Sequence, residues 1–353
     1  MGGGDIRFER KGALWLVTLN RPAALNALNE EMCLAHAAKL KEWEDDAGLS
    51  AVVVRGEGDK AFCAGGDVVS LYRSGLAWRG GDKTSLAWRR FFRAEYRMNA
   101  AIKDFKKPYV SFWDGVVMGG GVGISIHGSH CIATEKTLFA MPETGIGMIP
   151  EVGGGWFLPR LPGHAGIYLA LTGDRLKAPE TCGLGLAKGF IPSGKIGTVV
   201  EALVENPAAV DATLKAFCQN AGESRLHPHL RDIEKAFAGD TVEEIMLTLE
   251  REGTDWALGW HGRLLKKSPT SMKVTLRQLR EGARLRDFRE NMKMEYRIVN
   301  RILQGSDFYE GVRALLIDRD SAPRWHPDSL AGVSQAAVDA HFETLGRDEL
   351  GFD

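Results

Sequence analysis

Apolar positions in the first half of the chain fall into short continuous runs and into longer stretches with a helical period. The continuous runs, bounded by glycine, proline or acidic residues, predict buried strands at residues 13–19, 51–55 and 109–113. The helical period predicts helices over residues 30–46 and 88–105. Alternating strands and helices are typical of an α/β fold, in which helices cover a sheet.

The segment between the second strand and the second helix is rich in charged residues and glycine. Gly75, Gly80 and Gly81 lie within it. Because glycine leaves the backbone free to adopt many conformations, we expect a mobile excursion here rather than a regular element.

The second half of the chain has mostly helical periodicity, as in residues 241–250, 268–282 and 289–303. The composition changes between Pro192 and Gly197. We therefore predict a catalytic core over residues 5–195 and a helical region over residues 196–353. Such a region either closes over a site or forms a contact between copies in a homo-oligomer, and both alternatives stay open.

Charge and composition exclude several classes of protein. The 353 residues include 45 basic and 46 acidic ones, so no bulk positive field favours nucleic acid. The sequence contains no run of ~20 apolar residues, which a membrane-spanning helix would need. The start MGGGDIRFERKG has neither an apolar signal core nor an Arg/Ser-rich presequence, and we leave residues 1–4 out of the fold. Five scattered cysteines indicate reduced thiols, and we expect a cytoplasmic location.

Candidate chemistry gathers in residues 118–163. Glycine runs at 119–121 and 153–155 bracket Glu143 and Glu151, which have small or apolar neighbours. Glycines in runs are typical of places where the backbone turns sharply or approaches a ligand closely. A carboxyl group in apolar surroundings tends to have a raised pKa, which suits acid, base or nucleophilic chemistry.

Two glycine loops could bind an oxyanion. The sequences CAGGD at 63–67 and MGGG at 118–121 each follow a predicted strand or loop and leave backbone N–H groups uncovered. Two such groups can converge on one oxygen and stabilise its developing charge. Tight turns are the alternative for either loop alone, and the carboxylate pair favours the oxyanion hole. Neither loop fits the glycine patterns that bind nucleotide phosphates.

Several segments together resemble the crotonase (enoyl-CoA hydratase/isomerase) superfamily: RPAALNAL, AFCAGGD, GVVMGGGVG and MPETGIGMIPEVGGGWFLPRLPG. With SPTSMKVTLRQLREG, MEYRI and DFYEGVRALLIDRDSAPRW, the chain resembles its 3-hydroxyisobutyryl-CoA hydrolase branch over residues 6–350. The resemblance implies repeated ββα units, with two roughly perpendicular sheets surrounded by helices. It also implies thioester hydrolysis of 3-hydroxyisobutyryl-CoA, as in valine catabolism. CoA is then part of the substrate, and no separate cofactor or metal is required.

The resemblance also implies residue roles. The backbone N–H groups of Gly66 and Gly120 form the oxyanion hole. Glu143 acts as general base or as nucleophile. Hydratases of the superfamily place a second glutamate where this chain has Gly123. The chain therefore lacks half of the hydratase pair.

Two further acids complete the substrate contacts that the resemblance implies. Glu151 lies where the branch usually has aspartate, and it would bind the substrate's 3-hydroxyl group or place the water. Glu95, in the helix before the third strand, matches a substrate-binding glutamate.

Each acid also has a purely structural interpretation. Glu143 could be an acid at a helix start, and Glu151 could cap a helix that begins near Gly153. Glu95 could form a surface salt bridge with Arg93 or Arg97. For the whole chain, the alternatives are an enoyl-CoA hydratase/isomerase and a non-catalytic acyl-CoA-binding protein.

Four other residues are interpreted as structural. Asp67 is expected to cap a helix. The pair His127 and His130 has no third metal ligand nearby, which favours packing or hydrogen bonding over zinc. Cys63 is interpreted as a small buried residue rather than a nucleophile, because no histidine partner is apparent.

Overall fold

The computed structural model describes residues 4–352, and these form two compact units. Unit 1 contains the chain up to Gly66 together with Ala94–Ala140 and Arg175–His227. Unit 2 contains Asp67–Arg93, Met141–Asp174 and the chain from Pro228 onward. The division into a catalytic core at 5–195 and a helical region beyond stays a prediction about function.

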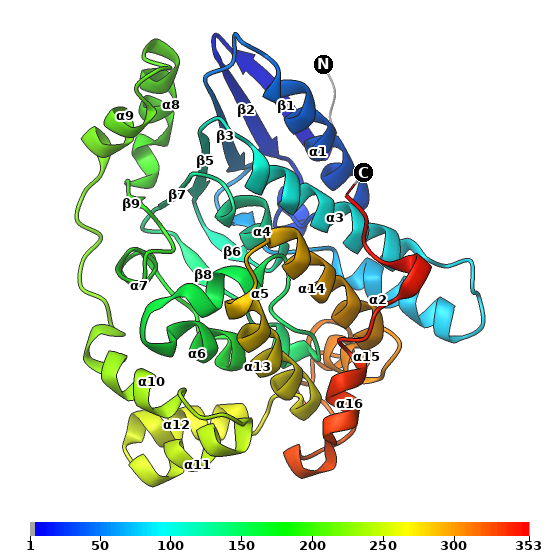
Figure 1. Cartoon of the computed structure of the whole chain (residues 1–353). Helices are drawn as coiled ribbons and strands as arrows, with labels where there is room; N and C mark the ends of the chain where they lie inside the picture. The colour runs from blue at the N-terminus through cyan, green and yellow to red at the C-terminus, as the bar shows by residue number, and fades with distance from the viewer. Residues whose placement is uncertain (1–3, 353) are drawn as a thin grey trace. The chain divides into compact units, whose positions relative to one another are not determined.

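The larger sheet of unit 1 has six strands in the order β1-β2-β3-β5-β7-β9 (Figure 1). The β1–β2 pair is antiparallel and the other neighbours are parallel. The strands are β1 (Ile6–Lys11), β2 (Leu14–Leu19), β3 (Ala51–Gly56), β5 (Tyr109–Trp113), β7 (His130–Ala133) and β9 (Gly189–Phe190). The three strands predicted from apolar runs are confirmed. β1 was not predicted because only two of its six residues, Ile6 and Phe8, are apolar.

A second, three-stranded parallel sheet in unit 1 pairs β4 (Ala61–Cys63) with β6 (Val116–Met118), and β6 with β8 (Leu138–Ala140). The two glycine loops follow β4 and β6, which are neighbours in this sheet. Parallel neighbours end at the same edge. The topology therefore brings the two loops together.

Helices of unit 1 pack on the larger sheet. Leu16, Val53 and Phe112 of the sheet share a buried cluster with Val199 and Leu214, and this apolar burial is the main force that holds the layers together. The helices of unit 1 are α1 (Glu30–Glu44), α4 (Gly120–Ile126), α7 (Ala178–Gly183), α8 (Ile196–Glu205), α9 (Val210–Phe217), the short η1 (Pro22–Ala24) and η5 (Ser193–Lys195), and the part of α3 (Ala87–Asp104) from Ala94 onward.

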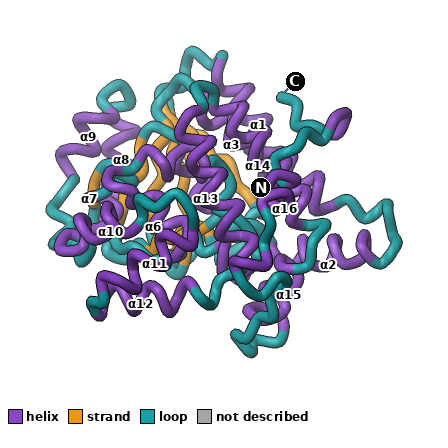
Figure 2. The backbone as a smooth tube through the Cα atoms, turned by 60° about the horizontal axis from the view of Figure 1, so that its bottom comes forward, coloured by secondary structure: helices purple, strands orange, loops and turns teal. Residues whose placement is uncertain are grey.

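Unit 2 is helical in its described part, and Figure 2 shows α10, α11, α12, α13, α15 and α16 joined by loops. Ser268 caps α13 by accepting a hydrogen bond from Ser271 N–H at 3.1 Å, with Pro269 in the first turn. The longer helices are α2 (Val68–Arg79), α6 (Ala165–Thr172), α10 (Leu230–Ala236), α11 (Val242–Glu252), α12 (Asp255–Leu264), α13 (Pro269–Arg284), α14 (Phe288–Ile302), α15 (Asp307–Val312) and α16 (Gln335–Ala340). Short helical turns are η2 (Glu143–Ile146), α5 (Gly154–Phe157), η3 (Leu158–Arg160), η4 (Pro162–His164), η7 (Arg313–Ile317), η8 (Leu330–Gly332) and η9 (Gly346–Asp348).

The predicted excursion is wrong at Gly75, because α2 occupies Val68–Arg79. Gly80 and Gly81 do lie outside any regular element, in the segment that joins α2 to α3. A methyl group at Gly75 would collide with the Tyr309 ring. The glycine therefore permits close packing of Tyr309 against α2 rather than flexibility. The predicted helices at 30–46, 88–105, 241–250, 268–282 and 289–303 are confirmed within a few residues.

None of the helices described in residues 4–352 has the length and apolar character that a membrane span requires.

Candidate functional site

The two glycine loops of unit 1 place backbone N–H groups at the ends of β4 and β6. Leu28 N–H donates to Gly65 O at 2.8 Å, which fixes the first loop immediately before Gly66. In the second loop, Val122 N–H donates to Gly119 O at 2.8 Å, so α4 begins at Gly120. The first N–H groups of a helix have no acceptor within that helix. The Gly120 N–H, at the first position of α4, therefore has no acceptor within this helix.

Gly66, Gly120 and Glu95 meet at one point in unit 1. A methyl group in place of the Gly120 hydrogen would lie 3.2 Å from the Gly66 nitrogen and would collide with Glu95 Oε1. A larger side chain at Gly120 would therefore have to displace the Glu95 carboxylate. The structure thus brings together three of the five predicted site residues.

Glu95 is a buried acid with an unsatisfied oxygen. Its side chain is 1% exposed, and Oε1 has no hydrogen-bond partner among the described residues. Burial raises the pKa of Glu95 to about 8. The alternative of a surface salt bridge with Arg93 or Arg97 is therefore wrong.

Glu143 is the first residue of η2 in unit 2, as its position after Pro142 suggests. It is 6% exposed, and Oε2 has no hydrogen-bond partner among the described residues. Burial raises the pKa of Glu143 to about 8, and the positive charge of Lys267 partly opposes this rise. A buried, unsatisfied carboxyl group is unlike an exposed acid that merely starts a helix.

Glu151 lies in the loop between η2 and α5, also in unit 2, and is 7% exposed. It does not cap α5. The Gly153 and Gly155 N–H groups at the start of that helix donate instead to Glu295 at 2.7 and 2.8 Å. The capping interpretation of Glu151 is therefore not supported.

Glu295 is a residue that the sequence reasoning missed. It lies on α14, and its side chain is fully buried. A signal for it existed in the sequence. Met292, Glu295 and Val299 are spaced by three and four, so the acid lies on the apolar stripe of its helix.

The residues interpreted as structural behave as expected. Asp67 accepts a hydrogen bond from Ser70 N–H at 3.2 Å at the start of α2. His130 is bonded to Asp211 through Nε2 at 2.7 Å and to the Ser129 hydroxyl through Nδ1 at 2.8 Å. Burial raises the pKa of the Cys63 thiol to about 12, which keeps it protonated and unreactive.

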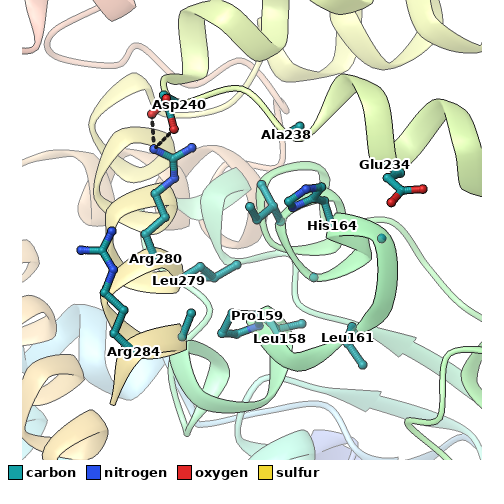
Figure 3. Close-up of a pocket in the computed structure, with 14 residues that line it drawn as sticks. Leu158, Pro159, Leu161, His164, Glu234, Ala238, Asp240, Leu279, Arg280 and Arg284 are labelled. Carbon is teal, nitrogen blue, oxygen red and sulfur yellow. Dashed lines mark hydrogen bonds and ion pairs between the residues drawn. The ribbon is translucent and has the colours of Figure 1, made fainter.

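A cavity of about 530 Å³ lies in unit 2 (Figure 3). Its walls include Leu158 and Leu161 on one side and Leu279 and Arg280 of α13 on the other. Arg280 is neutralised by Asp240 at 3.1 Å. None of the five predicted site residues lines this cavity, so it has no part in the chemistry considered below.

Comparison with known proteins gives the family. The model of the family described as Enoyl-CoA hydratase/isomerase matches residues 14–342. The chain belongs to this family. It is 44% identical to the mitochondrial 3-hydroxyisobutyryl-CoA hydrolase of Danio rerio, over 99% of this chain and 92% of that protein. It is 42% identical to the Homo sapiens protein of the same name, over 99% of this chain and 91% of the relative.

Solved structures confirm the predicted crotonase fold. A carnitinyl-CoA dehydratase from Mycobacterium thermoresistibile superposes with a TM-score of 0.92 at 38% identity, covering 99% of both chains. An enoyl-CoA hydratase from Rhodobacter sphaeroides 2.4.1 gives 0.90 at 36% identity, covering 99% of this chain and 100% of that one. These two proteins are named for dehydration and hydration rather than for hydrolysis, so the fold does not by itself decide the chemistry.

Proposed function

We propose that this chain is an acyl-CoA thioester hydrolase acting on 3-hydroxyisobutyryl-CoA, a reaction of valine catabolism. One observation carries the choice of reaction: similarity to proteins named 3-hydroxyisobutyryl-CoA hydrolase extends at 42–44% identity over 98–99% of the chain. CoA is part of the substrate, and the reaction requires no metal. The cytoplasmic location stays a prediction, since the named relatives are mitochondrial.

In this proposal, the Gly66 and Gly120 N–H groups hold the thioester oxygen. Two observations support this assignment: the Gly66 nitrogen lies close to Gly120, and Gly120 is the first residue of α4. Two donors aimed at the oxygen stabilise the negative charge that develops there when the carbonyl carbon is attacked. Donors that are already in place require no reorganisation during the reaction.

Glu143 supplies the reactive carboxylate by one of two routes. As general base it takes a proton from water, whose oxygen attacks the thioester carbon before the C–S bond breaks and CoA leaves with a proton. As nucleophile it attacks that carbon itself, CoA leaves, and water hydrolyses the resulting anhydride. Either route needs the ionised carboxylate. A raised pKa makes it a stronger base than an exposed glutamate.

Glu151 and Glu95 bind the substrate. Glu151 binds the 3-hydroxyl group or places the water, and Glu95, beside Gly120, contacts the acyl group. Glutamate in place of aspartate adds one methylene, about 1.5 Å of reach. Breadth among 3-hydroxyacyl-CoA substrates is therefore expected to depend on Glu151.

Two alternatives are distinguished by one pair of assays. An enoyl-CoA hydratase hydrates crotonyl-CoA and removes its ultraviolet absorbance. This chain has Gly123 where hydratases have their second glutamate, which argues against that activity. A non-catalytic acyl-CoA-binding protein is silent in both assays. We expect release of free CoA from 3-hydroxyisobutyryl-CoA, detected with a thiol reagent. Loss of the enoyl absorbance without CoA release would favour the hydratase.

A further inference from the structure

The loop that contains Glu151 is held from both sides by helices of the same unit. Before Glu151, Pro150 O accepts a hydrogen bond from Gln278 Nε2 of α13 at 2.8 Å. After it, the Gly153 and Gly155 N–H groups donate to the Glu295 carboxylate of α14 at 2.7 and 2.8 Å. The loop is thus fixed one residue before Glu151 and two residues after it.

The Glu295 carboxylate is itself held by side chains. Asn291 Nδ2 donates to its Oε1 at 2.9 Å and Gln278 Nε2 at 3.1 Å. No ion pair to Glu295 exists among the described residues. Burial raises the pKa of Glu295 to about 7, and the amide N–H groups that donate to it oppose this rise. A buried carboxylate without a counter-ion is costly. An apolar side chain in its place would leave the buried Gly153 and Gly155 N–H groups without this acceptor.

The backbone that Glu295 holds is strained. Val152, between Glu151 and Gly153, has φ 53°, in the left-handed region that β-branched residues avoid. Such a conformation persists only where the surroundings determine it. The same loop is also packed closely against α14, because a methyl group at Gly155 would lie only 2.6 Å from Asn291 Oδ1.

We propose that Glu295 is a positioning residue for Glu151: by binding the Gly153 and Gly155 N–H groups it keeps the strained loop in the conformation that presents Glu151 to the acyl group. The inference rests on the proposed function, because it assumes that Glu151 recognises the substrate. Glu295 itself does not touch the reacting atoms. Its effect should therefore act through Glu151.

A matched control exists in unit 1. Glu180 is likewise a buried glutamate that accepts two backbone hydrogen bonds, from Lys177 N–H at 2.9 Å and Arg225 N–H at 2.8 Å. It is bonded to no predicted site residue. Glu180→Gln therefore reports what the loss of such a carboxylate does to stability alone.

The test compares kcat and KM for 3-hydroxyisobutyryl-CoA and isobutyryl-CoA in the wild type, E295Q, E180Q, E151A and the double variant E151A/E295Q. Glutamine leaves one of the two loop N–H groups facing an NH₂ group. We expect E295Q to lower kcat/KM for the hydroxylated substrate by roughly 10-fold or more, the scale of a lost charged hydrogen bond, and to affect isobutyryl-CoA much less. In the E151A background, E295Q should have an effect of about 3-fold or less, because the two residues act as one unit. E180Q should keep the substrate preference.

Hydrogen–deuterium exchange of the peptide spanning residues 148–157 gives a readout that is independent of activity. Exchange should rise in E295Q and stay unchanged in E180Q. If E295Q does not fold, Gln278→Met serves instead, because it removes the hydrogen bond to Pro150 with little change in side-chain volume. It should weaken the preference for the hydroxylated substrate and raise the exchange of the 148–157 peptide, as expected for E295Q.

The outcomes separate the two claims. If E151A abolishes the preference for the 3-hydroxyl group while a folded E295Q keeps it, the positioning role of Glu295 is refuted and the proposed function stands. If E151A keeps the preference, the role proposed for Glu151 fails, and the inference fails with it.

Discussion

Glu295 accepts a hydrogen bond from the Gly153 N–H group at 2.7 Å, although 142 residues separate the two in the sequence. The contact joins helix α14 to the loop that contains Glu151. The C-terminal segment with the sequence MEYRI, one of those that resemble the hydrolase branch, therefore supports a loop with a predicted site residue. This gives the C-terminal helices a local role besides closing a site or forming a subunit contact.

Replacing Glu143 by glutamine should lower kcat by at least ~100-fold, the scale of a lost general base. KM should change little, because the amide keeps the shape of the acid. Steady-state kinetics of CoA release measure both constants. A variant that retains most of its kcat would remove Glu143 from the mechanism.

The stability of the wild type should fall between about pH 4.5 and 8 relative to that of Glu143→Gln. The ordinary pKa of 4.5 applies to Glu143 in the unfolded chain, whereas the folded value is about 8. Between these values the folded state binds the proton more tightly, so raising the pH favours the unfolded state. In thermal unfolding experiments from pH 5 to 9, the Tm of the variant minus the Tm of the wild type should increase as the pH rises. A Tm difference independent of pH would mean that Glu143 ionises normally.

Gly120→Ala should reduce kcat/KM on the order of 10²-fold, because the added methyl group would displace the neighbouring groups and shift the N–H that is proposed to bind the thioester oxygen. The added methyl group would collide with Glu95 and would lie 3.2 Å from the Gly66 nitrogen. Gly183→Ala is the control, because a methyl group there meets no atom within 4 Å. Circular dichroism checks the fold of both variants. A folded, fully active Gly120→Ala variant would show that Glu95 can move aside without loss of activity. A folded, fully active Gly120→Pro variant, which has no N–H at this position, would contradict the oxyanion assignment.

Substrate preference should depend on Glu151. An acyl-CoA without the 3-hydroxyl group forfeits a charged hydrogen bond, worth about 1.5–3 kcal/mol or roughly 10- to 150-fold in kcat/KM. Isobutyryl-CoA should therefore be a poor substrate of the wild type. Glu151→Ala should narrow the gap between the two substrates, and Glu151→Asp should keep it. Equal loss on both substrates would assign Glu151 to the water or to the fold.

Local patterns predicted much of the fold. The apolar runs of β2, β3 and β5 and the periodicity of α1, α3, α13 and α14 are dictated by residues close in sequence. Strand β1 and helix α2 escaped prediction for tertiary reasons. β1 depends on pairing with β2, and Gly75 looks like a flexible position until Tyr309 packs against it.

For the predicted site residues, too, the sequence indicated some properties and not others. Their positions came from motif resemblance, whereas their environments depend on packing. The convergence of Gly66, Gly120 and Glu95 follows from the pairing of β4 with β6 and from the burial of α3, which charged neighbours on that helix concealed. Glu295 was missed because its partners are backbone N–H groups 140 and 142 residues away.

The most direct test of the central claim is the release of free CoA from 3-hydroxyisobutyryl-CoA by the purified full chain, with Glu143→Gln beside it and crotonyl-CoA hydration monitored in parallel. We expect rapid thiol release by the wild type, release at least ~100-fold slower by the variant, and little hydration by either. Efficient hydration of crotonyl-CoA without CoA release, or CoA release unchanged in Glu143→Gln, would contradict it.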